Sequence, residues 1–182
     1  QQMHATLLIE QGAGAGAFYS DRQYEESGAK IASGKEVMEQ ADLLIRINPF
    51  TNEEMSQMGT GKVLLSLINP LTNKNIIQYA AHHGLTTISL DMIPRSTRAQ
   101  SMDALTSQAL VAGYRCVLEG AMRFPRFLPL YMTAAGTIPP ANVLVLGAGV
   151  AGLQAIATAK RLGAKVQAYD VRSASADEVR SM

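Results

Sequence analysis

The chain has 182 residues, of which 47% are hydrophobic and 17% are charged, and its 16 basic and 15 acidic side chains give a formal net charge of +1. This composition supports a packed core, and without a basic tract it argues against nucleic acid and anionic membrane as partners. Cys116 is the single cysteine, which rules out an intramolecular disulfide, and its apolar helical surroundings predict a buried side chain.

Two further features of the sequence limit the class of protein. No uncharged apolar run reaches the roughly 18 residues of a membrane span, and the opening QQMHATLLIE lacks the basic region of a signal peptide. His82 and His83 are adjacent, point about 100° apart in a helix and have no third ligand in the pattern. We therefore expect no metal site, and a soluble chain that can still belong to a membrane assembly.

In chain order, short apolar β-rich runs alternate with helical patterns. The predicted strands are residues 5–10, 42–47, 62–68, 86–91, 142–147 and 165–170. The predicted helices are residues 34–41, 51–58, 72–84, 101–124 and 150–164. The glycine-rich run QGAGAGAF is interpreted as a flexible connection between the first strand and the next elements. The βαβ order predicts an α/β fold with parallel sheets and helices on both faces.

The segment INPFTN recurs 21 residues later as INPLTN. Each copy closes a predicted strand with Asn-Pro and then offers Thr-Asn as a helix N-cap, and Thr51 with Glu54 forms a capping-box pattern. We interpret the copies as two successive βα units with ordinary turn and cap chemistry. Asn48 and Asn69 nevertheless fall at the carboxyl ends of strands, where open α/β sheets bind ligands.

The sequence indicates two lobes. Pro139 and Pro140 must be extended and form a stiff hinge before a new strand. At about 1.5 Å per residue, the preceding long helix can join two lobes. We place the first lobe at residues 1–105 and a Rossmann-like second lobe at residues 106–182.

A glycine motif opens the last predicted helix. Gly147, Gly149 and Gly152 form G-x-G-x-x-G directly after a strand, and Asp170 ends the next strand 18 positions later. This spacing is typical of dinucleotide binding: the glycines allow a tight turn, close backbone approach to a pyrophosphate and helix packing, and the acid binds ribose hydroxyls. The charge of Asp170 favours NAD over NADP, but Arg172 leaves this choice open because an arginine can accommodate a 2′-phosphate.

Several segments resemble the NAD(H)-binding domain, domain I, of proton-translocating NAD(P) transhydrogenase. They are PRSTRAQSMDALTSQALVAGYR, MTAAGTIPPANVLVLGAGVAGLQAIATAKRLGAKVQAYDVR, GAKI and ADLLIRINP. The resemblance covers nearly the whole chain and is most specific from Arg95 to Arg172. In that family an opening strand and helix precede the position of Gln1, and further strands follow that of Met182. The resemblance therefore implies that the second lobe is truncated here.

The resemblance also implies roles for the loop after the first lobe's last strand. Arg95 and Asp103 would hold the nicotinamide carboxamide and the nearby ribose, and Gln100 would reach toward the partner domain's NADP. This chain has Thr106 where the family has serine, and Leu110 where it has asparagine. The expected catalytic residues are Arg95, Gln100 and Asp103. The expected cofactor-binding residues are these three with Ser96, Thr97, Thr106, Tyr114, Gly147, Gly149, Val150, Gly152, Asp170, Val171 and Arg172.

The resemblance implies an NAD(H)-binding component that passes hydride from NADH to NADP⁺ on a partner domain, coupled to proton movement across a membrane. Hydride transfer between two nicotinamides needs orientation and exclusion of water rather than a proton acceptor, which suits this loop. The implied partners are an NADP(H)-binding domain, a transmembrane proton-channel domain and a second copy of this domain. The implied location is the cytoplasmic face of a bacterial inner membrane, or the matrix side in a mitochondrion.

Two alternatives stay open on the sequence. Alanine dehydrogenase shares the two-lobe fold and binds pyruvate with a lysine and a histidine at strand ends of the first lobe. The corresponding positions here are Arg46 and Asn69, which leaves acid–base chemistry on a keto acid without a histidine. A non-catalytic NAD-binding module is the alternative from a different class.

Overall fold

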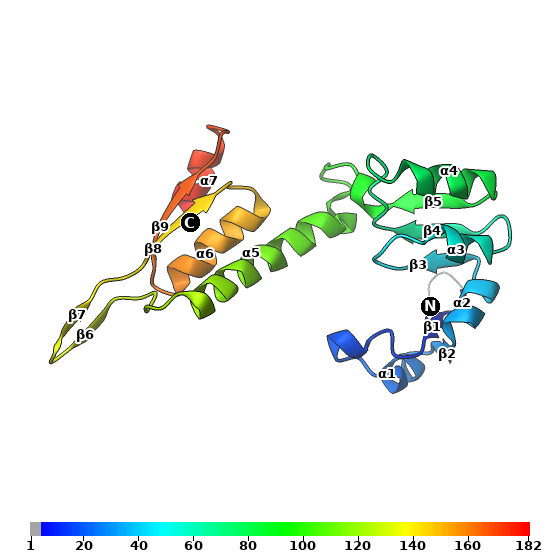
Figure 1. The fold of residues 1–182 in the computed structure, drawn as a ribbon, viewed down its shortest axis with the longest axis horizontal. Coiled ribbons are helices and arrows are strands. Elements are labelled where there is room, and N and C mark those ends of the chain that lie inside the picture. The colour runs from blue at the N-terminus through cyan, green and yellow to red at the C-terminus, as the bar shows by residue number, and fades with distance from the viewer. Residues whose placement is uncertain (1–4) are drawn as a thin grey trace. The chain divides into compact units, whose positions relative to one another are not determined.

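The computed structural model describes residues 5–182, and the chain divides into two compact units whose boundary falls between Met102 and Asp103. Both units combine strands and helices (Figure 1). None of the helices within residues 5–182 has both the length and the apolar content to cross a membrane. The predicted fold class, α/β with parallel sheets, is confirmed.

Unit 1, up to Met102, contains two small parallel sheets. Its strands are β1 (Leu8–Glu10), β2 (Lys30–Ala32), β3 (Leu43–Ile45), β4 (Val63–Ser66) and β5 (Thr86–Ser89). Its helices are α1 (Asp21–Glu26), α2 (Gly34–Gln40), α3 (Asn52–Ser56) and α4 (Lys74–His82), with 3-10 turns at Ala15–Ala17, Leu90–Met92 and Gln100–Met102. The strand β1 pairs with β2, and β3, β4 and β5 form a second sheet in that order.

The core of unit 1 lies on one face of the three-stranded sheet. Its buried residues are Leu44, Phe50, Met55, Met58, Leu64, Ala80 and Leu85. Because side chains alternate along a strand, Ile45 points to the opposite face, where it is 67% exposed. In the part of the chain that the structure describes, helices therefore cover one face of this sheet, where the sequence predicted cover on both.

Unit 2, from Asp103 onward, begins with the long helix α5 (Ala104–Arg123). An antiparallel hairpin follows, formed by β6 (Tyr131–Thr133) and β7 (Gly136–Ile138). The remaining elements are β8 (Asn142–Leu146), α6 (Val150–Arg161), β9 (Lys165–Tyr169) and α7 (Ser175–Ser181). The strands β8 and β9 pair in parallel, with Asn142 opposite Lys165 and Leu146 opposite Tyr169.

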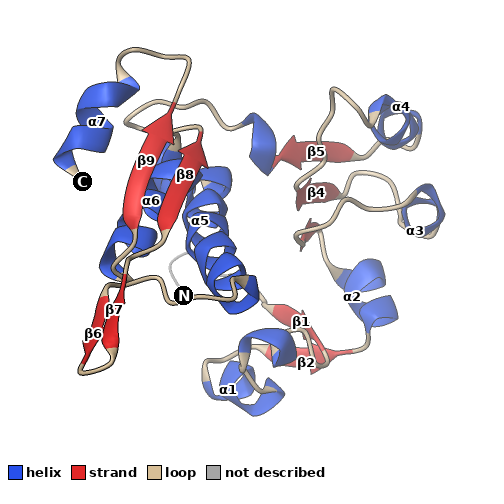
Figure 2. Ribbon diagram, turned by 60° about the vertical axis from the view of Figure 1, so that its left-hand side comes forward, coloured by secondary structure: helices blue, strands red, loops and turns tan. Residues whose placement is uncertain are grey.

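The helix α6 packs on β8 and β9, and α5 packs against α6 (Figure 2). The two helices come very close at Gly113, where an added Cβ would lie 2.1 Å from the carbonyl oxygen of Ala151. A groove of about 600 Å³ lies between α5 and β8, and Cys116 lines it. Cys116 is exposed, so its predicted burial was wrong. The helical pattern identified an apolar face of α5, but the buried contact is made at Gly113.

Local sequence signals account well for the helix starts of unit 1. Thr51 caps α3 and forms the predicted capping box with Glu54. Asn73 is the N-cap residue of α4, but its side chain donates to the carbonyl of Ile68 at 2.7 Å instead of capping the helix. The glycine-rich run is not a flexible connection as predicted, because it folds into a 3-10 turn fixed by a 2.8 Å hydrogen bond from Gly12 N to Asp21 Oδ1.

Candidate functional site

A tight turn joins β8 to α6 in unit 2. Gly147 has a φ of +96°, in the left-handed region that favours glycine. An added Cβ at Gly152 would lie 1.8 Å from the carbonyl oxygen of Gly147 and 3.7 Å from Cγ1 of Val145. The turn therefore requires glycine at both positions. Gly147 supplies the left-handed backbone conformation, and a side chain at Gly152 would clash with the carbonyl of Gly147.

The turn leads directly into the N-terminus of α6. Gly149 is the N-cap residue, and an added Cβ there would have no heavy atom within 4 Å, so open space borders the backbone. The first amides of a helix lack acceptors inside the helix and carry its positive dipole end. Here they belong to Val150, Ala151 and Gly152. Open space beside such amides suits a phosphate group.

The carboxylate of Asp170 lies beside this turn at the end of β9. Its Oδ2 accepts a 2.7 Å hydrogen bond from the backbone N–H of Ala148. Its Oδ1 accepts from the backbone N–H of Arg172 at 2.8 Å and from Arg172 Nε at 3.2 Å, and Arg172 Nη2 donates to Oδ2 at 3.3 Å. The structure thus brings the predicted acid against the predicted glycine turn.

The hydrogen bonds to Asp170 control its charge. The guanidinium of Arg172, followed by the backbone N–H groups of Arg172 and Ala148, holds the pKa of the Asp170 carboxyl well below its usual range. The same hydrogen bond and the charge of Asp170 raise the pKa of Arg172, and the negative charge of Glu178 raises it further. Asp170 is therefore a carboxylate at neutral pH, able to accept hydrogen bonds from a diol and to repel a phosphate. The next residue, Val171, is exposed.

Residues predicted to meet the nicotinamide end fall on both sides of the unit boundary. In unit 1, Arg95, Ser96 and Thr97 are exposed in a loop held by a 3.0 Å hydrogen bond from Ala99 N to the carbonyl of Ser96. Gln100 is exposed and starts the last 3-10 turn of that unit.

In unit 2, Asp103 is the N-cap residue of α5. Its Oδ1 accepts from the backbone N–H of Thr106 at 2.9 Å, and its Oδ2 accepts from the Thr106 hydroxyl at 2.6 Å. This arrangement follows from the preference of helices for Asp at the N-cap. Asp103 and Thr106, each predicted to bind the cofactor, are therefore in contact, and the Thr106 hydroxyl fixes the orientation of the carboxylate.

The helix α5 connects this pair to the glycine turn. Asp103 precedes Gly113 by ten positions, which corresponds to about 15 Å along a helix axis. At Gly113 the first turn of α6 packs against α5, and Tyr114 lies next to this crossing with 48% of its surface exposed. Unit 2 thus carries Asp103 at the start of α5 and Tyr114 in its middle, where the first turn of α6 packs against Gly113.

Arg46, which follows β3 directly, is fully engaged. Its Nη1 and Nη2 donate to the two carboxylate oxygens of Glu54 at 2.7 and 2.6 Å, Nε donates to the carbonyl of Asn48, and Nη2 donates to that of Pro49. The guanidinium also lies 4.0 Å from the ring centroid of Phe50. The hydrogen bond from Arg46 is the main cause that lowers the pKa of Glu54 to about 2.

The loops after β4 and β5 are tied together. Asn69 follows β4 with a φ of +50° and is exposed. The preceding N–H, of Ile68, donates to Asp91 Oδ1 at 3.0 Å, and the Ser89 hydroxyl donates to the same oxygen at 2.5 Å. These contacts make the carboxyl edge of the sheet an ordered surface built by hydrogen bonds within unit 1.

Sequence reasoning missed several residues that shape these sites. Ala148 was overlooked because its contribution is a backbone N–H, which carries no side-chain signal. Glu54 was identified only as a capping residue, and the same carboxylate also binds Arg46. The eight-residue separation of Arg46 and Glu54 matches no helical pairing, so only the tertiary fold reveals their contact.

Comparison with known proteins places both units in a family. Residues 1–112 match the family model described as "Alanine dehydrogenase/PNT, N-terminal domain", and residues 116–182 match its C-terminal counterpart. The chain is 47% identical over 182 residues to the first part of the NAD(P) transhydrogenase alpha subunit of Rhodospirillum rubrum, covering 97% of this chain and 47% of that protein. It thus spans between about a third and about half of the length of the curated transhydrogenase relatives it matches.

Solved structures agree. A transhydrogenase structure from Sinorhizobium meliloti superposes with a TM-score of 0.95 at 44% identity, over 99% of this chain and 52% of that one. An L-alanine dehydrogenase structure superposes with a TM-score of 0.84 at 24% identity, over 99% of this chain and 50% of that one, and shows a shared fold. The chain therefore belongs to the alanine dehydrogenase/PNT family, and among these relatives it is more similar to the transhydrogenase proteins than to the alanine dehydrogenase.

Proposed function

We propose that this chain is the NAD(H)-binding component of a proton-translocating NAD(P) transhydrogenase. Its role is to pass hydride from NADH to NADP⁺ on a partner domain, coupled to proton movement across a membrane. The observation that carries the proposal is the glycine turn at the N-terminus of α6 with the Asp170 carboxylate held against it. The identity to NAD(P) transhydrogenase alpha subunits supports it.

The residues of unit 2 fit a dinucleotide. The open backbone at Gly149 and the first amides of α6 suit the pyrophosphate, because they offer N–H donors without a side chain in the way. Asp170 suits the adenosine ribose, because its carboxylate accepts two hydroxyl donors. Val150, Val171 and Arg172 border this site in the sequence and are its further proposed members. Tyr114 is proposed to lie along the same cofactor.

The reaction needs little acid–base chemistry from the protein. Bound NADH supplies the hydride, so the protein must orient the nicotinamide and exclude water. Arg95, Gln100 and Asp103 are the proposed catalytic residues, supported by Ser96, Thr97 and Thr106. The carboxylate of Asp103 is already oriented by Thr106, which favours a positioning task over proton transfer.

The proposed partners and location are inferred from the similarity to transhydrogenase alpha subunits. We propose an NADP(H)-binding domain and a transmembrane proton-channel domain, with this domain on the cytoplasmic face of a bacterial membrane or the matrix side in a mitochondrion.

We also propose that the domain forms a homodimer through the β6–β7 hairpin. The hairpin extends away from the β8–β9 sheet (Figure 1), and Leu130, Tyr131, Met132 and Ile138 are exposed on or beside it. Exposed apolar side chains on such an arm are typical of a protein interface.

The geometry of unit 1 argues against the alanine dehydrogenase alternative. The position expected to bind a keto acid is Arg46, whose guanidinium is already bound to Glu54 and two backbone carbonyls. Asn69 offers no group that titrates near neutral pH. Pyruvate-dependent oxidation of NADH separates the two functions, and robust turnover of pyruvate would favour alanine dehydrogenase.

A single-turnover experiment tests the proposed function. The full-length gene product is mixed with NADH and an NADP⁺ analogue, with and without the NADP(H)-binding partner domain, and hydride transfer is followed by absorbance. We expect transfer only when the partner is present. Replacing Gln100 or Asp103 by Ala should slow transfer by about tenfold or more, because orientation is lost, while affinity for ADP-ribose stays the same. Transfer at the unchanged rate in both variants would remove these residues from the site.

A further inference from the structure

Hydrogen-bond donors from the protein itself saturate the Asp170 carboxylate. A carboxylate has about four acceptor positions on its two oxygens. Two are used by the backbone N–H groups of Ala148 and Arg172, at 2.7 and 2.8 Å. The other two are used by Nε and Nη2 of Arg172, at 3.2 and 3.3 Å. A ribose diol can therefore reach Asp170 only by replacing existing donors.

The two pairs of donors differ in strength and position. The backbone bonds are short and belong to groups fixed by the fold, whereas the guanidinium bonds are long. The Asp170 side chain is 11% exposed, but that of Arg172 is 62% exposed. The guanidinium thus lies on the solvent side of a nearly buried carboxylate. It is the donor set that an incoming ligand can displace.

We propose that Arg172 competes with the adenosine ribose for Asp170 and thereby sets how strongly the site distinguishes NADH from NADPH, an inference that rests on the proposed function. The two hydroxyls of the diol replace Nε and Nη2 one for one, so the number of hydrogen bonds to Asp170 is conserved. Binding of the diol breaks the ion pair between Arg172 and Asp170, and this loss lowers the affinity for NADH. Because Arg172 is largely exposed, loss of this ion pair should lower the affinity for NADH by a factor of at most about five.

The displaced guanidinium stays close to the ribose. The backbone N–H of Arg172 remains bonded to Oδ1 of Asp170, so the side chain is tethered beside the site. A 2′-phosphate replacing one ribose hydroxyl would meet the charge of Asp170 and also this cation, which binds phosphate well. Arg172 therefore lowers the affinity for NADH. At the same time it offsets part of the repulsion between Asp170 and the 2′-phosphate of NADPH.

The test compares three variants of the full-length gene product by titrating each with NADH and with NADPH and following nucleotide fluorescence. Arg172→Ala should bind NADH about two- to fivefold more tightly and NADPH at least about twofold more weakly than the wild type. Arg172→Lys keeps the charge but cannot donate two hydrogen bonds to Asp170 in the geometry of a guanidinium. It should therefore bind NADH more tightly than the wild type and keep the wild-type affinity for NADPH. Arg180→Ala is the matched control.

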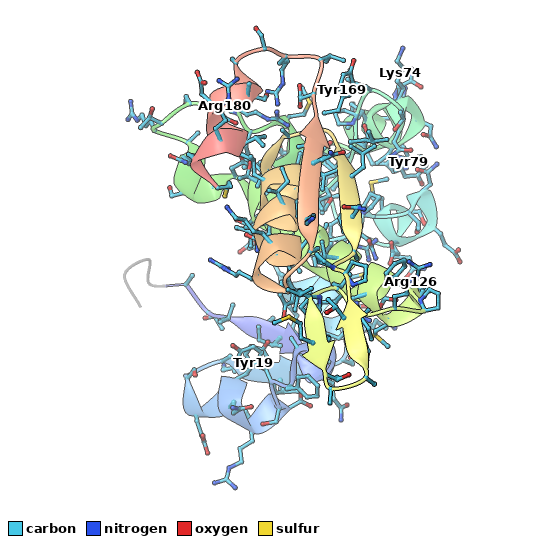
Figure 3. The ribbon with its side chains drawn as sticks, turned by 90° about the vertical axis from the view of Figure 1, so that its left-hand side faces the viewer. Tyr19, Lys74, Tyr79, Arg126, Tyr169 and Arg180 are labelled. Atoms are coloured by element: carbon cyan, nitrogen blue, oxygen red, sulfur yellow. The ribbon has the colours of Figure 1, made fainter. Side chains whose placement is uncertain are left out.

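Arg180 lies on α7, beyond the loop that follows Tyr169 (Figure 3), and pairs with Asp177 rather than Asp170. Its removal takes away one positive charge from α7, and both nucleotide affinities should stay unchanged. Melting temperatures of all variants verify that they are folded. Unchanged or weaker NADH binding by folded Arg172→Ala would overturn the inference and leave the proposed function intact. Absence of NADH binding by the wild type would overturn both.

Discussion

The backbone N–H of Ala148 donates a 2.7 Å hydrogen bond to Oδ2 of Asp170, 22 positions further along the chain. This contact joins the glycine turn before α6 to the end of β9. The Asp170 carboxylate therefore has two tasks. It fixes the turn at the proposed pyrophosphate site, and it is the proposed acceptor for the ribose hydroxyls. The two proposed halves of an adenosine diphosphate site are therefore coupled through a single side chain.

Asp170→Asn tests this coupling. Asparagine keeps one oxygen acceptor but removes the charge, so we expect NADH affinity to fall about tenfold or more, because hydrogen bonds to a charged acceptor are stronger than those to a neutral one. The preference for NADH over NADPH should shrink, because the repulsion of a 2′-phosphate is lost. Calorimetric titration measures both, with the exposed Asp177→Asn as control. A variant that keeps its NADH affinity would show that Asp170 lies outside the site.

Two glycines of α5 form a matched pair for stability. At Gly113 a Cβ would meet the carbonyl oxygen of Ala151 at 2.1 Å, whereas at Gly120 it would meet nothing within 4 Å. Gly113→Ala should lower the free energy of unfolding by about 1–3 kcal/mol, because α5 and α6 must separate. Gly120→Ala should raise it by up to about 1 kcal/mol through helix propensity. Equal effects in urea denaturation would contradict the close packing of α5 on α6.

The parts of the fold predicted correctly from sequence are those with a strong local signal. The strand before Gly147, the glycine turn and Asp170 follow from a spacing within about 30 residues, as expected for a βαβ unit, and α3 follows from the Thr51 cap. The strand β2 was missed because Ile31 is its only large apolar residue, so the sequence shows no apolar run there. The β6–β7 hairpin was missed because its turn lacks the Asn-Gly or Asp-Gly pair that marks such turns.

The contacts that complete the sites depend on tertiary structure. The Ala148 amide, the Arg46–Glu54 ion pair and the exposure of Cys116 are decided by which elements pack together. A helical pattern shows that α5 has an apolar face, but not which neighbour covers it. The same limit explains why the sequence predicted Asp170 as a ribose ligand but did not predict that Arg172 and backbone donors occupy its carboxylate.

The ion pair of Arg46 and Glu54 predicts a pH dependence. The native pKa of Glu54 is about 2, below its ordinary value of 4.5. The unfolded chain therefore binds more protons between these values, so the stabilisation is complete above about pH 4.5 and is lost as the pH falls toward 2. Glu54→Gln should cost about 1–2 kcal/mol at pH 7, after allowance for its partial exposure, and progressively less below pH 4.5.

Denaturant titration at about pH 7 and about pH 3, on either side of the unfolded pKa, measures this difference. Glu53→Gln changes the adjacent residue in the first turn of α3, outside the ion pair with Arg46, and serves as the control. A cost of Glu54→Gln that stays constant between the two conditions would mean that the pair does not stabilise unit 1.

The hairpin tests the proposed homodimer. Met132 in β6 is 74% exposed, and a lysine there should repel its counterpart or lose its apolar contact in a dimer. We expect sedimentation equilibrium to show a wild-type dimer whose dissociation constant rises about tenfold or more in Met132→Lys. Leu71→Lys is the control, since Leu71 is 76% exposed in unit 1, outside the hairpin. A monomeric wild type, or equal dissociation of both variants, would exclude dimerisation through this hairpin.

Above all, we propose that the chain binds NADH at the glycine turn and prefers it to NADPH. Isothermal titration of the full-length gene product with each nucleotide, under identical buffer conditions, measures this most directly. We expect saturable binding of NADH at one site per chain and weaker binding of NADPH. Absence of NADH binding, or tighter binding of NADPH, would contradict the claim.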